Sequence, residues 1–523
     1  MIFYAVLGAV VTFLLYVDVI YPFVIYPLKA RWHKCGSVPR ELSWPLGIPT
    51  TIGVFSNIKK DLHLQVLAAY DLSRSYKTSL RQSLGTWVVA TRDPENIKAV
   101  LSTKFNDFSL KERGIRLRHV IGDGIFTQDG APWKHSRDML RPQFSREQIS
   151  RVEVLSHHID VLIREIKKSG GNVELQRLFH LMTMDTATQF LFGESIGSLE
   201  VSGDSKGIEI TDPNTGDIVS TVDFVESYTF TNRFAMKKVF LNKWEFLANL
   251  SNPSYERHMR RVHTVLDHYV QLALKATEKY DPEDDSEKGE YYFSHELAKL
   301  TRDPLSLRNQ LFNILIAGRD TTAATLSYAF HYLTKNPAIY AKVREDVLTV
   351  FPDGDASLAT FEDLRKAKYL QMVIKEVLRL APAVPTNSRT AVRDTYLPRG
   401  GGPAGNLPVF VPKGTIIRYP AYILHRDPDI YGADSYDFNP ERWRPENKLP
   451  GSPMYSWGYI PFNGGPRICV GQQFALTEIA LTMIKLVLEF ERLEPADDFE
   501  PNLRDRTSLT SMVGGSGVRV KLS

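Results

Sequence analysis

The most informative stretch of this sequence is Phe462-Asn-Gly-Gly-Pro-Arg-Ile-Cys-Val-Gly471, which precedes the apolar-periodic run QQFALTEIALTMIKLVLEF. The periodicity of that run predicts a helix over 471–491, so Cys469 lies in a glycine-rich loop where the helix begins. Unpaired N–H groups and the positive end of the helix dipole stabilise a thiolate there. The stretch therefore predicts a soft, anionic metal ligand. The alternative is a buried structural cysteine, as most lone cysteines are.

The residues around Cys469 suit a flat, acidic cofactor. Phe462 offers an aromatic wall, Arg467 supplies a cation for a carboxylate, and Gly465 and Gly471 allow a tight backbone turn. The pattern F-x-x-G-x-R-x-C-x-G fixes five positions, and a chance match is rare, on the order of one in several thousand chains of this length. With this pattern the sequence resembles the cytochromes P450, the haem-thiolate monooxygenases. The resemblance implies that Cys469 is the axial ligand of haem iron.

The fold class expected from this resemblance is mainly α with small β-sheets (α+β), a cytochrome P450 fold with an N-terminal transmembrane helix. Amphipathic periodicity predicts helices over 144–168, 255–278, 305–335, 336–350, 361–380 and 471–491. Strand-like segments are short and lie at 87–91, 409–411, 415–418 and 517–521. The glycine- and proline-rich stretch 397–409 favours a long hairpin excursion over a linker, and the acidic segment 280–291 favours a solvated loop.

Composition excludes several classes of protein. The 523 residues carry 64 Lys and Arg against 60 Asp and Glu, a net charge of +4, which is too balanced to indicate nucleic-acid binding, and we expect none. With Cys35 and Cys469 as its two cysteines, the chain has neither a disulfide framework nor a zinc site built on three or four cysteines.

The N-terminus predicts a membrane anchor. Residues 1–28 are apolar except for Asp18, and the basic cluster that follows keeps the body cytosolic by the positive-inside rule. We expect a single-pass anchor in the endoplasmic reticulum membrane over 1–28, a basic, proline-rich hinge over 29–50 and a catalytic domain over 51–523. The rival, a cleaved signal peptide, lacks its basic n-region and cleavage site. The glycosylation sequon at Asn249 would stay unmodified in the cytosol.

Within the predicted helix 305–335, the segment Ala317-Gly-Arg-Asp-Thr-Thr322 opposes its own helix propensity. A threonine hydroxyl that bonds back to the preceding turn would widen the helix there and leave room for water. By itself the segment is a packing kink or a functional site. It resembles the oxygen-activation motif of the family, which implies that Asp320 and Thr321 relay protons and that Gly318 gives oxygen and substrate access. Family members with covalently attached haem carry a glutamate at the position of Ala317. The cofactor expected here is therefore haem b, non-covalent apart from the Cys469 thiolate–iron bond.

Several basic residues match family positions that contact the haem propionates. Trp133 and Arg137 lie at i, i+4 spacing in W-x-x-x-R, Arg389 follows a proline bend, and Arg467 completes the set. Arg118 and His119 lie where some members add a contact. The resemblance also implies a buried structural network of three charged residues behind the thiolate: Glu376, Arg379 and Arg442. The E-x-x-R spacing alone predicts only a surface ion pair, as at Glu362/Arg365.

The resemblance indicates both partners and reaction. The chain has no flavin domain and no nucleotide-binding motif, so the expected electron donor is NADPH–cytochrome P450 reductase, with cytochrome b5 as a second candidate. Lys134, His135 and Arg141 offer a basic docking face. Segments such as 121–131 and 462–478 look like those of the fungal n-alkane and fatty-acid terminal hydroxylases. The expected reaction is hydroxylation of an aliphatic chain at its terminal carbon.

Three alternatives stay open. They are the same chemistry on a secondary metabolite, a haem-thiolate isomerase or dehydratase, and a haem protein without turnover. Retention of Asp320 and Thr321 argues against the last two. The segments expected to select the hydrophobic substrate are 109–130, 224–250, the helix 305–335, 383–388 and 511–516.

Overall fold

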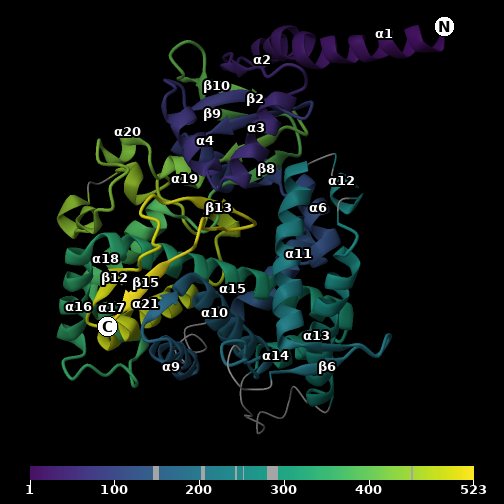
Figure 1. Cartoon of the computed structure of the whole chain (residues 1–523). Coiled ribbons are helices and arrows are strands. Elements are labelled where there is room, and N and C mark those ends of the chain that lie inside the picture. Colours follow the sequence, from purple (N-terminus) through teal and green to yellow (C-terminus); the bar gives the residue numbers. More distant parts are fainter. Residues whose placement is uncertain are drawn as a thin grey trace.

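The computed structural model describes residues 1–144, 152–201, 207–241, 244, 246–250, 252–278, 292–448 and 451–523. Helices make up most of this chain and the strands form small sheets (Figure 1), which confirms the expected α+β class. The acidic segment 280–291, the start of the predicted helix 144–168 and the last residue of the sequon at Asn249 lie outside the described residues.

Of the predicted helices, those over 255–278, 305–335, 336–350 and 471–491 match α13, α15, α16 and α21 to within two residues at each end. The helices are α1 (Ile2–Leu15), α2 (Tyr26–Trp32), α3 (Ile48–Lys59), α4 (His63–Leu72), α5 (Pro94–Lys98), α6 (Lys111–Ile121), α7 (Gly130–Leu140), α9 (Val152–Lys168), α10 (Leu175–Phe192), α11 (Thr221–Leu241), α12 (Phe246–Leu250), α13 (Tyr255–Ala276), α14 (Phe293–Leu300), α15 (Pro304–Lys335), α16 (Pro337–Val350), α17 (Phe361–Lys366), α18 (Lys368–Leu380), α19 (Ala421–Leu424), α20 (Pro428–Tyr431) and α21 (Gln472–Glu489).

The strands are short, with the longest spanning seven residues. They are β1 (Arg40–Glu41), β2 (Thr78–Ser83), β3 (Thr86–Thr91), β4 (Phe108–Ser109), β5 (Asn172–Glu174), β6 (Glu209–Thr211), β7 (Ile218–Ser220), β8 (Asn387–Ala391), β9 (Thr395–Gly401), β10 (Leu407–Val411), β11 (Ile416–Tyr419), β12 (Leu493–Pro495), β13 (Asp505–Thr507), β14 (Ser511–Val513) and β15 (Arg519–Leu522).

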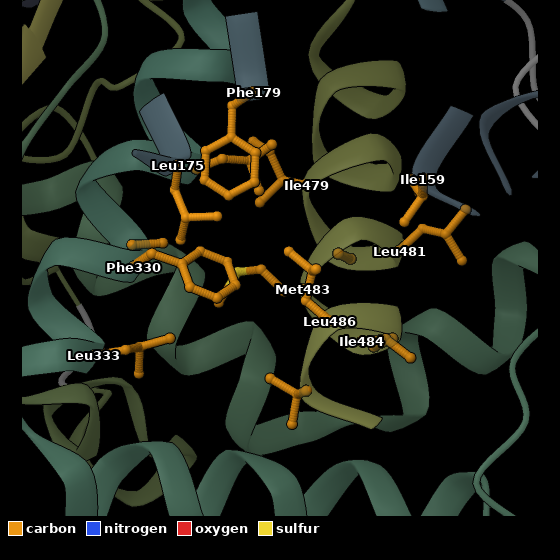
Figure 2. Packing of buried hydrophobic residues seen from close by; sticks show 14 of the residues in the cluster. Ile159, Leu175, Phe179, Phe330, Leu333, Ile479, Leu481, Met483, Ile484 and Leu486 are labelled. Atoms are coloured by element: carbon orange, nitrogen blue, oxygen red, sulfur yellow. The ribbon is translucent and has the colours of Figure 1, made fainter. Parts of the chain in front are cut away.

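The largest hydrophobic core lies where α9, α10, α15 and α21 meet. Figure 2 shows Phe179 of α10, Phe330 of α15 and Met483 of α21 packed against one another within it. All three side chains are inaccessible to solvent. Side chains of α15 and α21 share this core. The helix that carries Gly318 and Thr321 therefore holds a fixed position relative to the helix that follows Cys469.

A six-stranded sheet has the order β1-β2-β3-β11-β8-β4. Strand β11 pairs in parallel with β3 and antiparallel with β8, so that Ile417 lies opposite both Val89 and Arg389. This pairing brings Arg389 and Tyr419, which are distant in sequence, to the end of the sheet nearest the Cys469 loop.

The predicted hairpin excursion over 397–409 is confirmed. Strands β9 and β10 pair antiparallel, with Leu397 opposite Val409 and Leu407 opposite Gly401. Gly400 and Gly402 in this turn both have positive φ angles, which accounts for the glycine-rich sequence.

The prediction of one helix over 361–380 is wrong, because the chain forms two helices, α17 and α18, that are separated at Ala367. A capping box between Thr360 and Asp363 starts the first helix. Asp346 of α16 accepts hydrogen bonds from the backbone N–H groups of Tyr369 and Leu370 at 2.9 and 3.0 Å, which caps the second helix from another element. Sequence periodicity does not reveal such a tertiary cap.

One helix of the described chain, Ile2–Trp32, is long and apolar enough to cross a membrane by length and composition. It passes from α1 through a π-helical segment, η1 (Tyr16–Ile25), into α2. Figure 1 shows α1 projecting away from the body, whereas α2 lies beside the strands β9 and β10. The helix therefore continues past the expected boundary at residue 28, and its second half packs on the sheet.

Candidate functional site

A cavity of about 260 Å³ lies between α15 and the loop that precedes α21. Cys469 and Phe462 line it from the loop, and Gly318 and Thr321 line it from α15. Most of the remaining wall is apolar and includes Leu110, Ile125, Phe126, Phe144, Phe190, Leu191, Ile314, Ala383, Val384, Phe474 and Ile479. The cavity thus joins the two motifs that the sequence singled out.

The Cys469 loop is closed by a hydrogen bond from the Cys469 backbone N–H to the carbonyl of Phe462 at 3.1 Å. Gly465 has a φ of +67°, and a Cβ there would lie 1.9 Å from the carbonyl oxygen of Leu101. Gly471 has an ordinary φ of −90°, and a Cβ there would contact Phe144 at 3.5 Å. Packing against another segment therefore requires glycine at position 465, whereas the backbone does not require it at position 471.

The side chain of Cys469 lines the cavity and is accessible from it, although protein atoms surround the rest of the thiol. Burial raises the pKa of Cys469, while the Gly471 backbone N–H and the positive charge of Arg137 act in the opposite direction. The helix-end stabilisation expected from the sequence is present, but it is smaller than the effect of burial. A metal cation on the sulfur would tip this balance toward the thiolate.

Cations line one end of the cavity. Trp133, Arg137, Arg389 and Arg467 all contribute to the wall, as the sequence predicted. The guanidinium of Arg467 lies 4.3 Å from the centre of the Trp133 ring and 2.7 Å from a carboxylate oxygen of Asp129. Within the described residues, Arg389 donates to two neutral oxygens, the Ser388 carbonyl at 2.8 Å and the Asn387 side chain at 3.2 Å.

Sequence reasoning missed Arg113, which also lines the cavity. Its guanidinium donates to the side-chain oxygen of Asn387, and its Nε is buried without a recorded partner in the described chain. Burial and the nearby charge of Arg389 lower the pKa of Arg113 to about 10. The one nearby feature of the sequence that could have indicated this packing was Gly114. A Cβ there would lie 2.5 Å from the Thr127 carbonyl and would force α6 away from the segment that contains Thr127.

These residues fit haem. The cavity offers apolar walls for the macrocycle, a cysteine sulfur for the iron, and a cluster of guanidiniums for the propionates. Burial, Arg389 and Arg113 lower the pKa of Arg467 to about 9 despite the opposing charge of Asp129. Like charges crowded at the edge of an apolar cavity are destabilised, and an anion placed among them relieves that cost.

On the opposite wall, the Thr321 hydroxyl donates to the carbonyl of Ala317 at 2.6 Å, the back-bond that the sequence predicted. The helix nevertheless stays α-helical from Pro304 to Lys335, so the expected local widening is absent. A Cβ at Gly318 would meet only Ala187, at 4.0 Å. The glycine therefore leaves open cavity space rather than relieving a backbone contact.

Asp320 does not line the cavity, unlike its neighbours Gly318 and Thr321. One carboxylate oxygen accepts a hydrogen bond from the Asn232 side chain of α11 at 2.5 Å, and the other lies 2.8 Å from Arg319. Both partners hold the carboxylate in the protein interior, where it is nearly inaccessible to solvent. A proton moving from Asp320 to the cavity must therefore pass through another group or follow a rotation of the side chain.

Glu376, Arg379 and Arg442 come together behind the Cys469 loop. The carboxylate of Glu376 bonds Arg379 through both oxygens, at 2.7 and 2.8 Å, and Arg442 at 3.5 Å. Trp443 Nε1 also donates to Glu376, at 2.8 Å. Glu376 and Arg379 have no solvent-accessible surface, so each buried charge is paired within the protein.

A second buried carboxyl, Glu478 of α21, was not singled out by the sequence. It accepts a hydrogen bond from the Thr186 hydroxyl at 2.5 Å and also bonds Thr322, which lines the cavity. No cation forms an ion pair with it among the described residues. Burial raises the pKa of Glu478 to about 7, so its proton is retained to near-neutral pH.

Some predicted contacts are not part of this cavity. Arg118 forms an exposed ion pair with Asp123, and neither Arg118 nor His119 lines the wall. Among the described residues, those of 224–250 and 511–516 are also absent from the wall. Helix α11 packs against α13 and α6, whereas Phe246 and Leu250 after it are exposed. Ser511 is bonded to Tyr328. The predicted segments 109–130, 305–335 and 383–388 do line it.

Comparison with known proteins agrees with this geometry. A family model described as Cytochrome P450 matches residues 51–515. The chain is 86% identical to Cytochrome P450 52-N1 of Starmerella bombicola over 523 residues, which covers 100% of both chains. It is 45% identical to Cytochrome P450 52-M1 of the same organism, over 95% of this chain and 93% of that protein. Cytochrome P450 52A1 of Candida tropicalis is 45% identical over 85% of this chain and 80% of its own length.

Proposed function

We propose that this chain, which belongs to the cytochrome P450 family, hydroxylates the terminal carbon of a fatty acid or n-alkane at a membrane. The family is one of haem-thiolate monooxygenases, and the three relatives named above share the number 52 in their names. The observation that supports the substrate class is the largely apolar cavity wall around Cys469, which suits an aliphatic chain rather than a polar molecule.

The haem would be held by residues on three sides of the cavity. Cys469 would ligate the iron, and Phe462 and the apolar wall would contact the macrocycle. The propionates would be bound by the cationic end of the cavity, which comprises Arg113, Trp133, Arg137, Arg389 and Arg467. Insertion of one oxygen atom of O2 into a C–H bond uses the chemistry that thiolate-ligated haem supplies.

The proton needed for oxygen activation would reach the cavity at the hydroxyl oxygen of Thr321. This hydroxyl donates its proton to the Ala317 carbonyl, so its oxygen is left to accept a hydrogen bond from a group in the cavity and to hold that group in place. Asp320 lies next in the chain, and its side chain would have to rotate away from Asn232 and Arg319 before it could pass a proton to Thr321. Gly318 leaves room for oxygen and substrate above the same turn.

The electrons would come from NADPH through a separate reductase, with cytochrome b5 as a second candidate donor. Lys134, His135 and Arg141 are exposed on and just after α7, whose Arg137 reaches the Cys469 loop through the carbonyl of Ile468 at 3.0 Å. A basic face close to the thiolate suits an acidic electron-transfer partner. The N-terminal helix would anchor the enzyme in the endoplasmic reticulum membrane, with residues 51–523 in the cytosol.

Product analysis tests the substrate class. Membranes that contain the chain and a matching reductase are supplied with NADPH and a panel of n-alkanes and fatty acids, and the products are identified by mass spectrometry. Terminal alcohols or diacids are the expected result. Intact thiolate-type carbonyl spectra without product from any chain length would overturn the aliphatic assignment and favour a secondary metabolite.

Replacement of Thr321 tests the proton route. We expect Thr321→Ala to retain haem but to divert most of the NADPH electrons to hydrogen peroxide, because proton delivery at this atom is lost. Thr334→Ala is the matched control, since Thr334 makes the same back-bond to Phe330 at 2.7 Å in the same helix but does not line the cavity. Unchanged coupling in Thr321→Ala would contradict the assignment.

A further inference from the structure

Asp18 is an anomaly in the sequence, because it interrupts an otherwise apolar N-terminal run. A carboxylate at the centre of a membrane-spanning helix is energetically costly, because lipid cannot solvate its charge. Such residues persist where a partner satisfies them. The proposed anchoring of this helix in a membrane leaves the role of Asp18 unexplained.

The structure gives Asp18 partners in the catalytic domain. The side chain is fully buried, and one oxygen accepts a hydrogen bond from the backbone N–H of Leu46 at 3.0 Å. The other oxygen accepts from the side-chain amide of Gln82 on β2. Within the described chain the amide oxygen of Gln82 has no partner. The side chain of Gln82 is therefore held there by its hydrogen bond to Asp18. The anchor helix is thereby tied to the end of β2, the second strand of the six-stranded sheet.

Further contacts hold the same face of the helix. Trp87 Nε1 on β3 donates to the carbonyl of Val17 at 2.8 Å, and the Tyr26 hydroxyl donates to the carbonyl of Phe410 on β10 at 2.8 Å. The residues buried on this face recur about every four positions, as the π-helical geometry of η1 allows: Asp18, Pro22, Tyr26 and Ala30. The second half of the helix therefore packs into the core of the domain.

The opposite face of this docked half is apolar and exposed. Val19, Ile20, Phe23, Val24 and Leu28 each have more than two-fifths of their surface accessible. The free part, α1, has 14 residues and rises only about 21 Å, whereas a hydrocarbon core is about 30 Å thick. A span that starts at Ile2 therefore includes the first docked turns, and lipid is the occupant that the exposed face requires.

We propose that Asp18 is a latch that joins the membrane helix rigidly to the sheet and so holds the catalytic domain against the bilayer in one orientation. This end of β2 and the loop around Leu46 then lie at the membrane surface. Trp32 and Trp44 flank this region with 86% and 64% of their surface exposed, which suits the amphipathic interface between lipid and water. The inference rests on the proposed membrane anchoring and is independent of the substrate.

The test uses the full-length haem-loaded chain in lipid nanodiscs, with Asp18→Leu as the variant that removes the latch. Alkaline extraction of membranes first establishes that wild type and variant both insert. We expect Asp18→Leu to broaden the distribution of haem tilt measured by linear dichroism. Hydrogen exchange at the Leu46 amide should become about tenfold faster, because its acceptor is lost. Equal tilt and equal exchange in both proteins would overturn the latch.

Two further variants keep the test decisive. Gln82→Glu opposes the carboxylate of Asp18 and should loosen the helix, whereas the double variant Asp18→Asn with Gln82→Glu restores a donor and an acceptor and should recover the wild-type tilt. Thr12→Leu, in the free part of the same helix, should change neither measurement. If the wild-type chain is extracted by alkali, the anchoring proposal itself fails, which separates that failure from a failure of the latch.

Discussion

Two groups of buried arginines differ in how completely the protein satisfies them. Arg379, behind the Cys469 loop, donates five hydrogen bonds, two to Glu376 and three to backbone carbonyls. Arg113, at the cavity, leaves its Nε unpaired within the described chain, and the charge of Arg389 acts on it more strongly than that of Asp129. A guanidinium whose N–H donors are paired within the protein holds the fold together. A guanidinium that leaves a donor unpaired beside a cavity suits an incoming anion.

The largest effect is expected from removing Arg379, whose N–H donors are all paired within the protein. We expect Arg379→Met to destabilise the chain by about 3–5 kcal/mol, because Glu376 is left as an uncompensated buried charge. Denaturant unfolding and the yield of haem-loaded protein measure this loss. Arg365→Met is the matched control, since Arg365 has the same E-x-x-R spacing to Glu362 on an exposed helix and should change stability by less than about 0.5 kcal/mol. Equal effects of the two substitutions would remove the distinction between buried and exposed pairs.

Cys469→Ala should separate function from fold. We expect complete loss of the thiolate-type carbonyl spectrum and of monooxygenase activity, with a free energy of unfolding of the haem-free chain within about 1 kcal/mol of wild type. Cys35→Ala serves as the control and should retain both spectrum and activity. A Cys469→Ala protein that kept the thiolate-type spectrum would contradict the ligand assignment.

A smaller effect is expected at Arg113, whose Nε has no partner within the described chain. Arg113→Gln should leave the stability of the haem-free chain unchanged or increased, because it removes a crowded charge, while haem affinity falls about tenfold, or 1.4 kcal/mol. Transfer of haem to an acceptor protein measures the affinity. Arg118→Gln on the same helix should have no such effect, since Arg118 pairs with Asp123 at the surface. Wild-type haem retention by Arg113→Gln would show that Arg113 does not meet the propionates.

The smallest effect concerns Glu478, a buried carboxyl that, unlike Glu376, has no cationic partner among the described residues. Burial raises the pKa of Glu478 to about 7, so the folded chain binds a proton there that the unfolded chain loses near pH 4.5. Stability contributed by this proton is present at low pH and is lost as pH rises through about 7. We therefore expect Glu478→Gln to stabilise the chain relative to wild type more at pH 8 than at pH 5.5.

Thermal unfolding at the two pH values measures this difference. Glu489→Gln, at the end of the same helix, is the control and should show no such pH dependence. A wild-type chain whose stability relative to Glu478→Gln is constant between pH 5.5 and 8 would contradict a raised pKa at Glu478.

The sequence alone determined the features that are local. The Cys469 loop, the back-bonded Thr321 and the spacing of Trp133 and Arg137 are each encoded within a few residues, because helix periodicity and turn chemistry act over one or two turns. The overall fold class followed from the same patterns. The break between α17 and α18 was missed, because its cap comes from Asp346 on another helix.

Tertiary structure decided which of several equivalent residues reach the site. Nothing in the sequence distinguishes Arg113 from Arg118, and only the packing of α6 turns one into the cavity and the other to solvent. The same holds for Asp320, which Asn232 and Arg319 hold away from the cavity wall. Asp18 interrupts a membrane span in the sequence and becomes a buried contact only when Leu46 and Gln82 are placed beside it. Buried polar groups need partners, and the chain supplies those partners from positions far apart in sequence that only folding brings together.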